Sequence, residues 1–152
     1  MALDIRTVLD AVQSHALTSG HFSTVNGHEP LSPPTSGITA AVWSEQIGPA
    51  RGGSGLGSTS ARLALFVRLY APLWQQEPDA IDPALMDALD WLMGAYSGDF
   101  TLDGLIRQVD LLGAYGEPLG ARAGYLAEGG SEYRVFTITL PLIVNDLWTQ
   151  EA

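Results

Sequence analysis

Three histidines are the first residues whose chemistry needs testing, because imidazole nitrogens are common ligands of zinc. His15, His21 and His28 lie at intervals of six and seven residues, and Glu29 follows the last of them. These intervals match no metal-ligand motif. The chain contains no cysteine, which excludes thiolate ligands and disulfides. We interpret the histidines as surface side chains and expect no metal and no cofactor.

A glycine-rich segment from Pro49 to Ser60 resembles a phosphate-binding loop in composition only. A P-loop needs a lysine, and the chain contains none. The segment also joins two predicted strands, so no helix N-terminus is present there to bind an anion. We therefore predict a mobile loop over residues 49–60 that becomes ordered on a partner. Arg51, its only charged residue, and Leu56 are candidate contacts.

Carboxylates are concentrated between Glu77 and Asp110, a segment with eight acids and one base, Arg107. Paired carboxylates can perform acid–base catalysis. Asp87 and Asp90, however, fall on the solvated side of a predicted helix. No nucleophile with a base and an orienting acid is indicated by these residues, so we do not expect an enzyme.

Tryptophan gives the clearest indication of protein–protein contact, because it is enriched among residues that dominate binding interfaces. Trp74 follows a predicted strand, Trp91 lies off the apolar stripe of a predicted helix, and Trp148 lies near the C-terminus. A tryptophan in any one of these places is usually part of a core. Together they favour subunit contact, and we take all three as candidate interface residues.

The 152-residue chain has a net charge of −10 and a length that fits one domain. Binding to nucleic acid phosphates requires clustered positive charge, which this composition does not indicate. No apolar run approaches the roughly 18 residues of a membrane span. The N-terminus has no apolar signal core. We expect a single soluble domain that is made in a cytoplasm.

Two helices are predicted from apolar spacing. Residues 4–19 repeat apolar side chains at helical intervals, with Asp4 as the N-cap and Gly20 as the stop. The second helix is expected to start at Asp82-Pro83, which are good N-cap and N1 residues, and to end at Gly98. Its buried stripe is predicted to contain Leu85, Ala88, Leu89, Leu92, Met93 and Tyr96.

Two segments beside the 49–60 loop alternate as strands with one buried face do. Residues 38–47 are expected to place Trp43 and Ile47 on one face and Val42 on the other. Residues 61–70 have two predicted faces: Leu63, Leu65, Val67 and Leu69 form one, and Arg62, Phe66, Arg68 and Tyr70 form the other. Together these segments predict a hairpin. Residues 21–25 are a candidate short strand with a tight turn at Asn26-Gly27.

The C-terminal third is predicted to hold strands over residues 108–112, 119–126 and 132–144, followed by a tail over residues 145–152. Pro141 cannot donate a ladder hydrogen bond, which predicts that its strand lies at a sheet edge or bulges there. We therefore expect an α+β fold. It has a single domain with a mainly antiparallel sheet of about five to six strands and two principal helices packed on it.

Three segments carry a resemblance to a known family. They are Ser60 to Tyr70, Val109 to Gly116, and Tyr133 to Trp148, which contains Thr-Ile-Thr-Leu-Pro-Leu-Ile-Val-Asn-Asp. With the order of elements, they make the chain resemble the tail terminator (tail completion) proteins of long-tailed bacteriophages. The segment over residues 27–38 does not match. The matching motifs are structural and not catalytic.

The resemblance implies a structural virion protein over residues 1–152. Such proteins form a hexameric ring that caps the tail tube, ends its polymerisation and offers a docking surface to the head connector. The implied partners are further copies of the chain, the tail tube protein and the head–tail connector or stopper protein. DNA would pass through the lumen without specific binding. The implied location is the neck of the virion, after assembly in the host cytoplasm.

Two alternatives stay open. The chain could be another neck component, such as a stopper or head-completion protein that docks on the opposite side. It could also be a small-molecule-binding or hydrolytic α+β domain, which would need a deep pocket with perturbed titratable groups.

Overall fold

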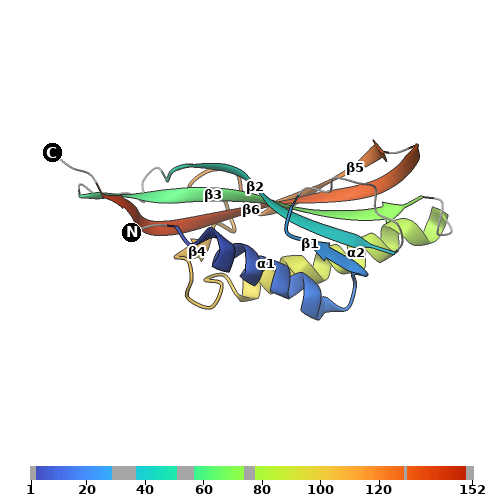
Figure 1. The fold of residues 1–152 in the computed structure, drawn as a ribbon, viewed down its shortest axis with the longest axis horizontal. Helices are drawn as coiled ribbons and strands as arrows, with labels where there is room; N and C mark the ends of the chain where they lie inside the picture. The colour runs from blue at the N-terminus through green and yellow to red at the C-terminus, as the bar shows by residue number, and fades with distance from the viewer. Residues whose placement is uncertain (1–2, 29–36, 51–56, 74–77, 129, 150–152) are drawn as a thin grey trace.

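A computed structural model describes residues 3–28, 37–50, 57–73, 78–128 and 130–149. It is a single α+β domain with two helices and a curled, mostly antiparallel sheet of six strands, which confirms the expected fold class (Figure 1). The elements in chain order are α1 (Ile5–Ser19), β1 (Thr24–Asn26), β2 (Thr39–Pro49), β3 (Ser58–Pro72), α2 (Pro78–Gly98), β4 (Gln108–Val109), β5 (Gly120–Glu128) and β6 (Ser131–Thr149).

The strands lie in the order β1-β2-β3-β6-β4, with β5 also paired to β6. Pairing is antiparallel except between β1 and β2, which run parallel from the Thr24–Thr39 pair. A two-residue turn connects only antiparallel strands. The tight hairpin turn predicted at Asn26-Gly27 is therefore wrong.

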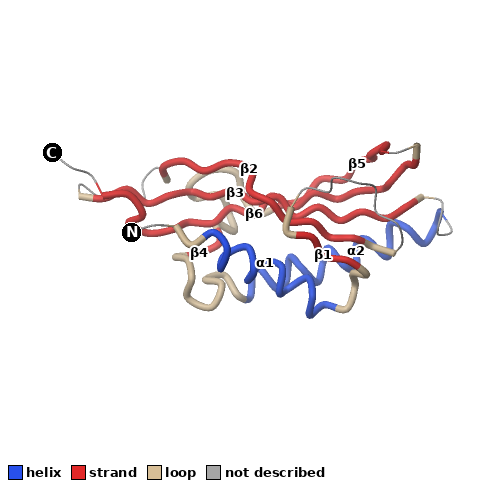
Figure 2. The backbone as a smooth tube through the Cα atoms, in the orientation of Figure 1, coloured by secondary structure: helices blue, strands red, loops and turns tan. Residues whose placement is uncertain are grey.

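Both helices cover the same face of the sheet, here called the inner face (Figures 1 and 2). The predicted leucine face of β3 lies here, and Leu65 and Leu69 are fully buried. Opposite them in β6 lie Leu140 and Phe136. Most of the predicted α2 stripe is buried as well: Leu85, Ala88, Leu89, Leu92 and Tyr96.

The helix ends follow local capping chemistry. The Asp4 carboxylate accepts hydrogen bonds from the backbone amide and hydroxyl of Thr7, and Gly20 ends α1 with φ of 76°. The predicted start of α2 at Asp82-Pro83 is wrong, because the helix begins at Pro78. Pro78 suits the first helical position, whereas Pro83 lies inside the helix and has no N–H to donate to the preceding turn. Burial of Ile81 to 4% exposure stabilises the extra turn.

A β-bulge between Ser44 and Gln46 reverses the faces of β2. Trp43 lies opposite Phe66, whereas Ile47 lies opposite Leu63 of the inner face. Directly opposed residues share a face, so Trp43 and Ile47 are on different faces and the prediction that they share one is wrong.

The predicted loop over residues 49–60 is shorter in the structure. Pro49 belongs to β2, and Ser58 to Ser60 belong to β3. Residues 51–56 lie outside the described part of the chain.

Strand β6 is interior, with β3 on one side and both β4 and β5 on the other. The predicted edge position is therefore wrong, and the alternative, a bulge at Pro141, is wrong as well, because Pro141 pairs in regular register with Ala64 of β3. The Pro141 carbonyl accepts from the Asp110 amide at 2.9 Å. The N and O atoms of an antiparallel strand residue point to the same neighbouring strand. The missing N–H of Pro141 therefore also faces the β4 and β5 side of β6. There, β5 pairing ends at Thr139 and β4 pairing begins at Leu142, so no ladder bond is lost.

Two other C-terminal predictions need correction. The predicted strand over residues 108–112 is only two residues long, and Leu112 is 94% exposed. Residues 145–149 of the predicted tail are instead part of β6, which continues to Thr149 after an irregularity opposite Ser60, and residues 150–152 lie outside the described part of the chain. Asp146 has φ of 51° there, and its carboxylate accepts from the Ser58 hydroxyl at 2.7 Å.

Candidate functional site

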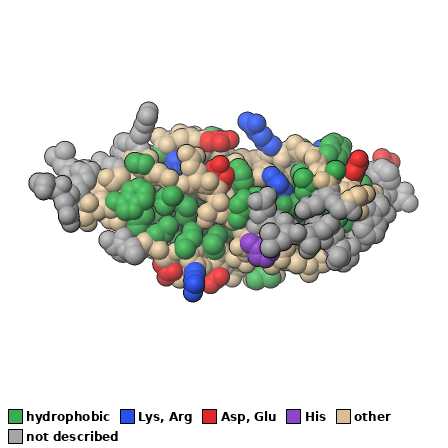
Figure 3. All heavy atoms as spheres, turned by 45° about the horizontal axis from the view of Figure 1, so that its top comes forward, with side chains coloured by type: hydrophobic (Ala, Val, Ile, Leu, Met, Phe, Trp, Pro, Cys, Tyr) green, Lys and Arg blue, Asp and Glu red, His purple; other side chains and the backbone are tan. Residues whose placement is uncertain are grey.

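The outer face of the sheet is the candidate site, because in the described part of the chain no helix covers it (Figure 1). Register assigns its side chains. Arg62, Phe66 and Arg68 of β3 lie opposite Ile143, Thr139 and Thr137 of β6, and Arg122 of β5 lies on the other side of Thr137. Figure 3, with the upper side of Figure 1 turned forward, shows arginine side chains (blue) among apolar, neutral and some acidic (red) side chains.

Arg68 is held in place by three neighbours. Its Nε donates to the Thr137 hydroxyl at 2.8 Å, and its guanidinium lies 5.3 Å from the Trp43 ring centroid and 6.0 Å from that of Tyr70. Trp43 in turn packs edge-to-face on Phe66 at 5.9 Å. Stacking and hydrogen bonding restrict the rotamers of Arg68, so its charge is presented in a preorganised position.

Arg122 is the exposed partner of Arg68 in the same cross-strand row. Thr137 separates the two residues, so their Cα atoms lie roughly 10 Å apart at the usual strand spacing. A hollow of about 310 Å³ lies beside them, with Leu126 and Val135 among its lining residues and no acidic side chain among those that the structure describes. This half of the face combines positive charge with the partly buried Trp43 and Leu126, which pack on a small buried cluster that includes Tyr70 and Val135.

Arg62 lies further along β3, in a more mixed setting. One terminal nitrogen donates to the Glu117 carbonyl at 2.9 Å. Its buried Nε has no hydrogen-bond partner among the described atoms. A Cβ on Gly116 would lie 2.7 Å from this Nε, so the backbone approaches Arg62 closely only because residue 116 is glycine.

A second hollow, of about 400 Å³, lies beside Arg62 and is also lined by Glu45 and Glu117. The two hollows share Phe66, Arg122 and Thr137, and together they form a shallow depression that we call the outer trough. Its Arg62 end is electrically mixed, and its Arg68–Arg122 end is basic.

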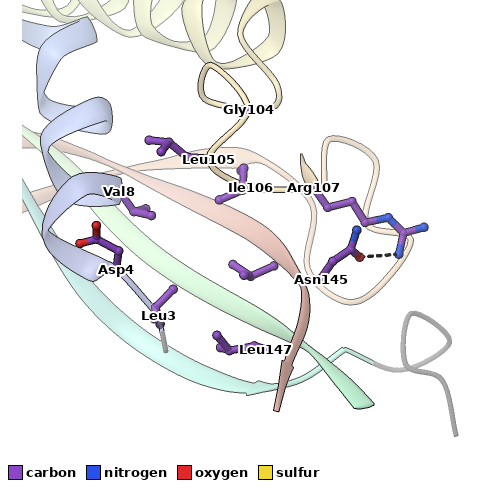
Figure 4. Close-up of a pocket in the computed structure, with 10 residues that line it drawn as sticks. Leu3, Asp4, Val8, Gly104, Leu105, Ile106, Arg107, Asn145 and Leu147 are labelled. Atoms are coloured by element: carbon purple, nitrogen blue, oxygen red, sulfur yellow. Dashed lines mark hydrogen bonds between the residues drawn. The ribbon is translucent and has the colours of Figure 1, made fainter. Parts of the chain in front are cut away.

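A separate apolar pocket of about 320 Å³ lies at one end of the molecule, between the start of α1, residues 104–107 and the end of β6 (Figure 4). Leu3, Val8, Ile106 and Leu147 point into it (Figure 4). Arg107 lies at its side and donates to Asn145 at 3.4 Å. This arrangement offers mainly apolar contact, and Asp4, Arg107 and Asn145 are the polar side chains among its described lining residues.

His15 connects α1 to the segment after α2. Its Nε2 lies 2.8 Å from the Asp99 carboxylate, and its ring packs edge-to-face on Tyr96 at 5.7 Å. Burial opposes ionisation of Asp99, but hydrogen bonds from the Asp103 amide and from His15 outweigh it and lower the Asp99 pKa. The interpretation of His15 as an accidental surface side chain is wrong, because it contacts Asp99 and Tyr96 and so joins α1 to the end of α2.

Tyr96 has a structural role as well. Its buried hydroxyl donates to the Val12 carbonyl at 3.1 Å, and burial raises its pKa far above the ordinary value. Within the described residues, no group of three or more His, Asp or Glu side chains is placed to hold a metal ion.

The structure describes two of the five predicted interface residues, Trp91 and Trp148. Trp91 is 36% exposed on α2 and Trp148 is 40% exposed on β6, and neither lines the outer trough. Arg51, Leu56 and Trp74 lie outside the described residues. Sequence alternation placed Arg62 and Arg68 on one face but did not bring Arg122 to them, because that step needs the register of β5 on β6.

No helix among the described residues is long and apolar enough to cross a membrane. Comparison of the sequence with models of protein families finds no match, and comparison with curated proteins finds no similar sequence.

Proposed function

We propose that the protein is a structural subunit that assembles with further copies of itself into a ring of the tail terminator type. In this role the ring caps a tail tube, ends its polymerisation and provides a docking surface for a head connector. The three segments described above support the proposal, since they resemble those of tail terminators. The chemistry of such a protein is the complementarity of its surfaces, and it needs no catalytic residue.

The observation that carries the proposal is the outer face of the sheet. A sheet in a two-layer domain normally packs one face on helices and leaves the other to water or to a partner. Here the second face holds the preorganised Arg68, the exposed Arg122 and the Trp43–Phe66 pair. Arginine and aromatic residues are enriched where proteins bind proteins.

Exposed aromatic residues add to this support. Trp91 and Trp148 expose 36% and 40% of their surface on two different elements. A ring subunit needs contact surfaces for its neighbours and for the tube, so more than one exposed apolar site is expected. The acidic excess of the chain suits a lumen that has to release DNA.

Light scattering after gel filtration tests the proposal over a range of protein concentrations. We expect a mass that rises with concentration to a ring, and class averages from negative-stain electron microscopy with six-fold symmetry and a central hole. Added to polymerising tube protein, the protein should stop tube growth. A strict monomer at all concentrations, with and without tubes, would contradict the proposal.

The same preparation distinguishes the neck alternatives. A tail terminator should be retained by immobilised tube protein, whereas a stopper or head-completion protein should be retained by the connector alone.

A further inference from the structure

The basic end of the outer trough is unusual in a chain of net charge −10. Three of its seven basic residues, Arg62, Arg68 and Arg122, are on this one face. Glu45 and Glu117 line the hollow beside Arg62, which Arg122 lines as well, whereas no described acid lines the hollow beside Arg68 and Arg122. A surface that concentrates positive charge in this way is complementary to an acidic partner surface.

The described structure itself carries such an acidic surface on the solvent-facing side of α2. Asp87 and Asp90 are exposed and three positions apart, so their side chains lie on the same side of the helix. Neither has an ion-pair partner among the described residues, in contrast to Asp82, which pairs with Arg134 at 3.0 Å. Met86 and Trp91 flank them with 47% and 36% exposure.

The two surfaces match in chemistry and in scale. Asp87 and Asp90 are separated by about 4.5 Å along the helix axis, and the roughly 10 Å between Arg68 and Arg122 is within reach of their long side chains. Trp91 and Met86 supply apolar area that fits beside the partly exposed Leu126 of the trough. We propose that the Asp87–Asp90–Trp91 surface of α2 in one copy docks on the Arg68–Arg122 end of the outer trough of the next copy.

The positions of the two surfaces define the kind of contact. The helices lie below the sheet (Figure 1). Strand register assigns the residues that line the trough to the other face, so the two surfaces are on opposite sides of one subunit. Each copy then offers a different surface to each neighbour. Such a heterologous contact repeats from copy to copy and closes into a ring when the rotation permits.

This inference rests on the proposed self-assembly and names the two surfaces through which neighbouring copies bind each other. Nucleic acid is the other polyanion that could contact the arginines, but the overall negative charge of the protein disfavours its approach.

Charge reversal on either surface tests the contact. One variant carries Arg122→Glu, and the other carries Asp87→Arg with Asp90→Arg. Each alone should raise the concentration of half-assembly by at least about tenfold, because like charges then face each other in every contact. An equimolar mixture of the two variants should assemble again, because each altered surface finds its complement on the other variant.

Two further charge reversals serve as controls. Arg6→Glu and Asp10→Arg change exposed residues of α1 away from both surfaces and should leave half-assembly unchanged. Circular dichroism and the midpoint of urea unfolding establish that every variant is folded.

The outcomes separate this inference from the proposed function. Assembly that is unaffected by either reversal, or is weakened without rescue in the mixture, overturns the contact but leaves the ring intact. A wild-type protein that never self-associates overturns both. Loss of binding to a double-stranded DNA oligonucleotide by Arg122→Glu, with unchanged assembly, assigns the trough to nucleic acid and overturns the contact.

Discussion

At the scale of single residues, the contacts that organise this protein join positions far apart in the chain. His15 meets Asp99 across 84 positions, and Arg68 meets Thr137 across 69. Neither pair has a sequence signal, because no local pattern states which side chains a fold brings together. The sequence indicated the chemistry available to each residue, and only the structure supplies the partner.

The His15–Asp99 pair predicts how stability depends on pH. The Asp99 pKa is below its ordinary value of 3.8 in the folded protein, because the hydrogen bonds to its carboxylate outweigh the effect of burial. A lowered folded-state pKa stabilises the protein above the unfolded-state pKa, and this contribution is lost as the pH falls through the folded-state value. We therefore expect Asp99→Asn to lower the free energy of unfolding near neutral pH and to have a smaller effect as the medium becomes more acidic.

Urea unfolding of the wild type and of Asp99→Asn, from neutral pH to below pH 3.8, measures this difference. Asp10→Asn removes one exposed charge from α1 and is the matched control, with an expected change of less than about 0.5 kcal/mol at every pH. A difference between wild type and Asp99→Asn that stays constant, or grows with acidity, would contradict the assignment.

At the scale of elements, the sequence-based predictions were correct for features that depend on residues close together in the chain. They placed both ends of α1, the end of α2 and the two faces of β3, because capping residues and alternation act within a few positions. Sequence reasoning was wrong where the structure depends on which strands pair with each other. The parallel partner of β1, the bulge in β2 and the interior place of β6 depend on strands elsewhere in the chain. The candidate site follows the same division, since Arg62 and Arg68 were placed on one face and Arg122 was not.

The segment after β4 gives a prediction at this scale. Asp110 is 1% exposed, and its carboxylate accepts from the backbone amides of Ala114 and Tyr115 at 2.7 and 2.9 Å. Asn at this position would turn one NH₂ group toward an amide donor and leave a partly buried backbone N–H without its partner. We expect Asp110→Asn to lower the free energy of unfolding by about 1–3 kcal/mol.

Urea denaturation measures the effect of Asp110→Asn, and Asp103→Asn provides the comparison. Asp103 is exposed, and its replacement removes the same charge. A result in which the two variants differ by less than about 0.5 kcal/mol would show that the Asp110 carboxylate does not hold this loop.

At the scale of the whole molecule, charge acts on assembly in two opposing ways. Copies of net charge −10 repel one another at long range, whereas the proposed contact joins arginine to aspartate at short range. Salt screens the long-range term strongly, because the Debye length falls from about 30 Å at 0.01 M to about 10 Å at 0.1 M ionic strength. Short-range pairs at an interface are screened less, but they too weaken with salt.

The two terms are separable in kinetics. We expect the association rate constant to rise as salt increases from about 0.01 to 0.1 M, because repulsion slows encounter between like-charged copies. The dissociation rate constant should also rise, because the Arg–Asp contacts weaken, and this second effect should be smaller in Arg122→Glu. Stopped-flow light scattering after mixing and after dilution measures both constants. An association rate that falls with salt would mean that attraction between local patches, and not net charge, controls how these subunits meet.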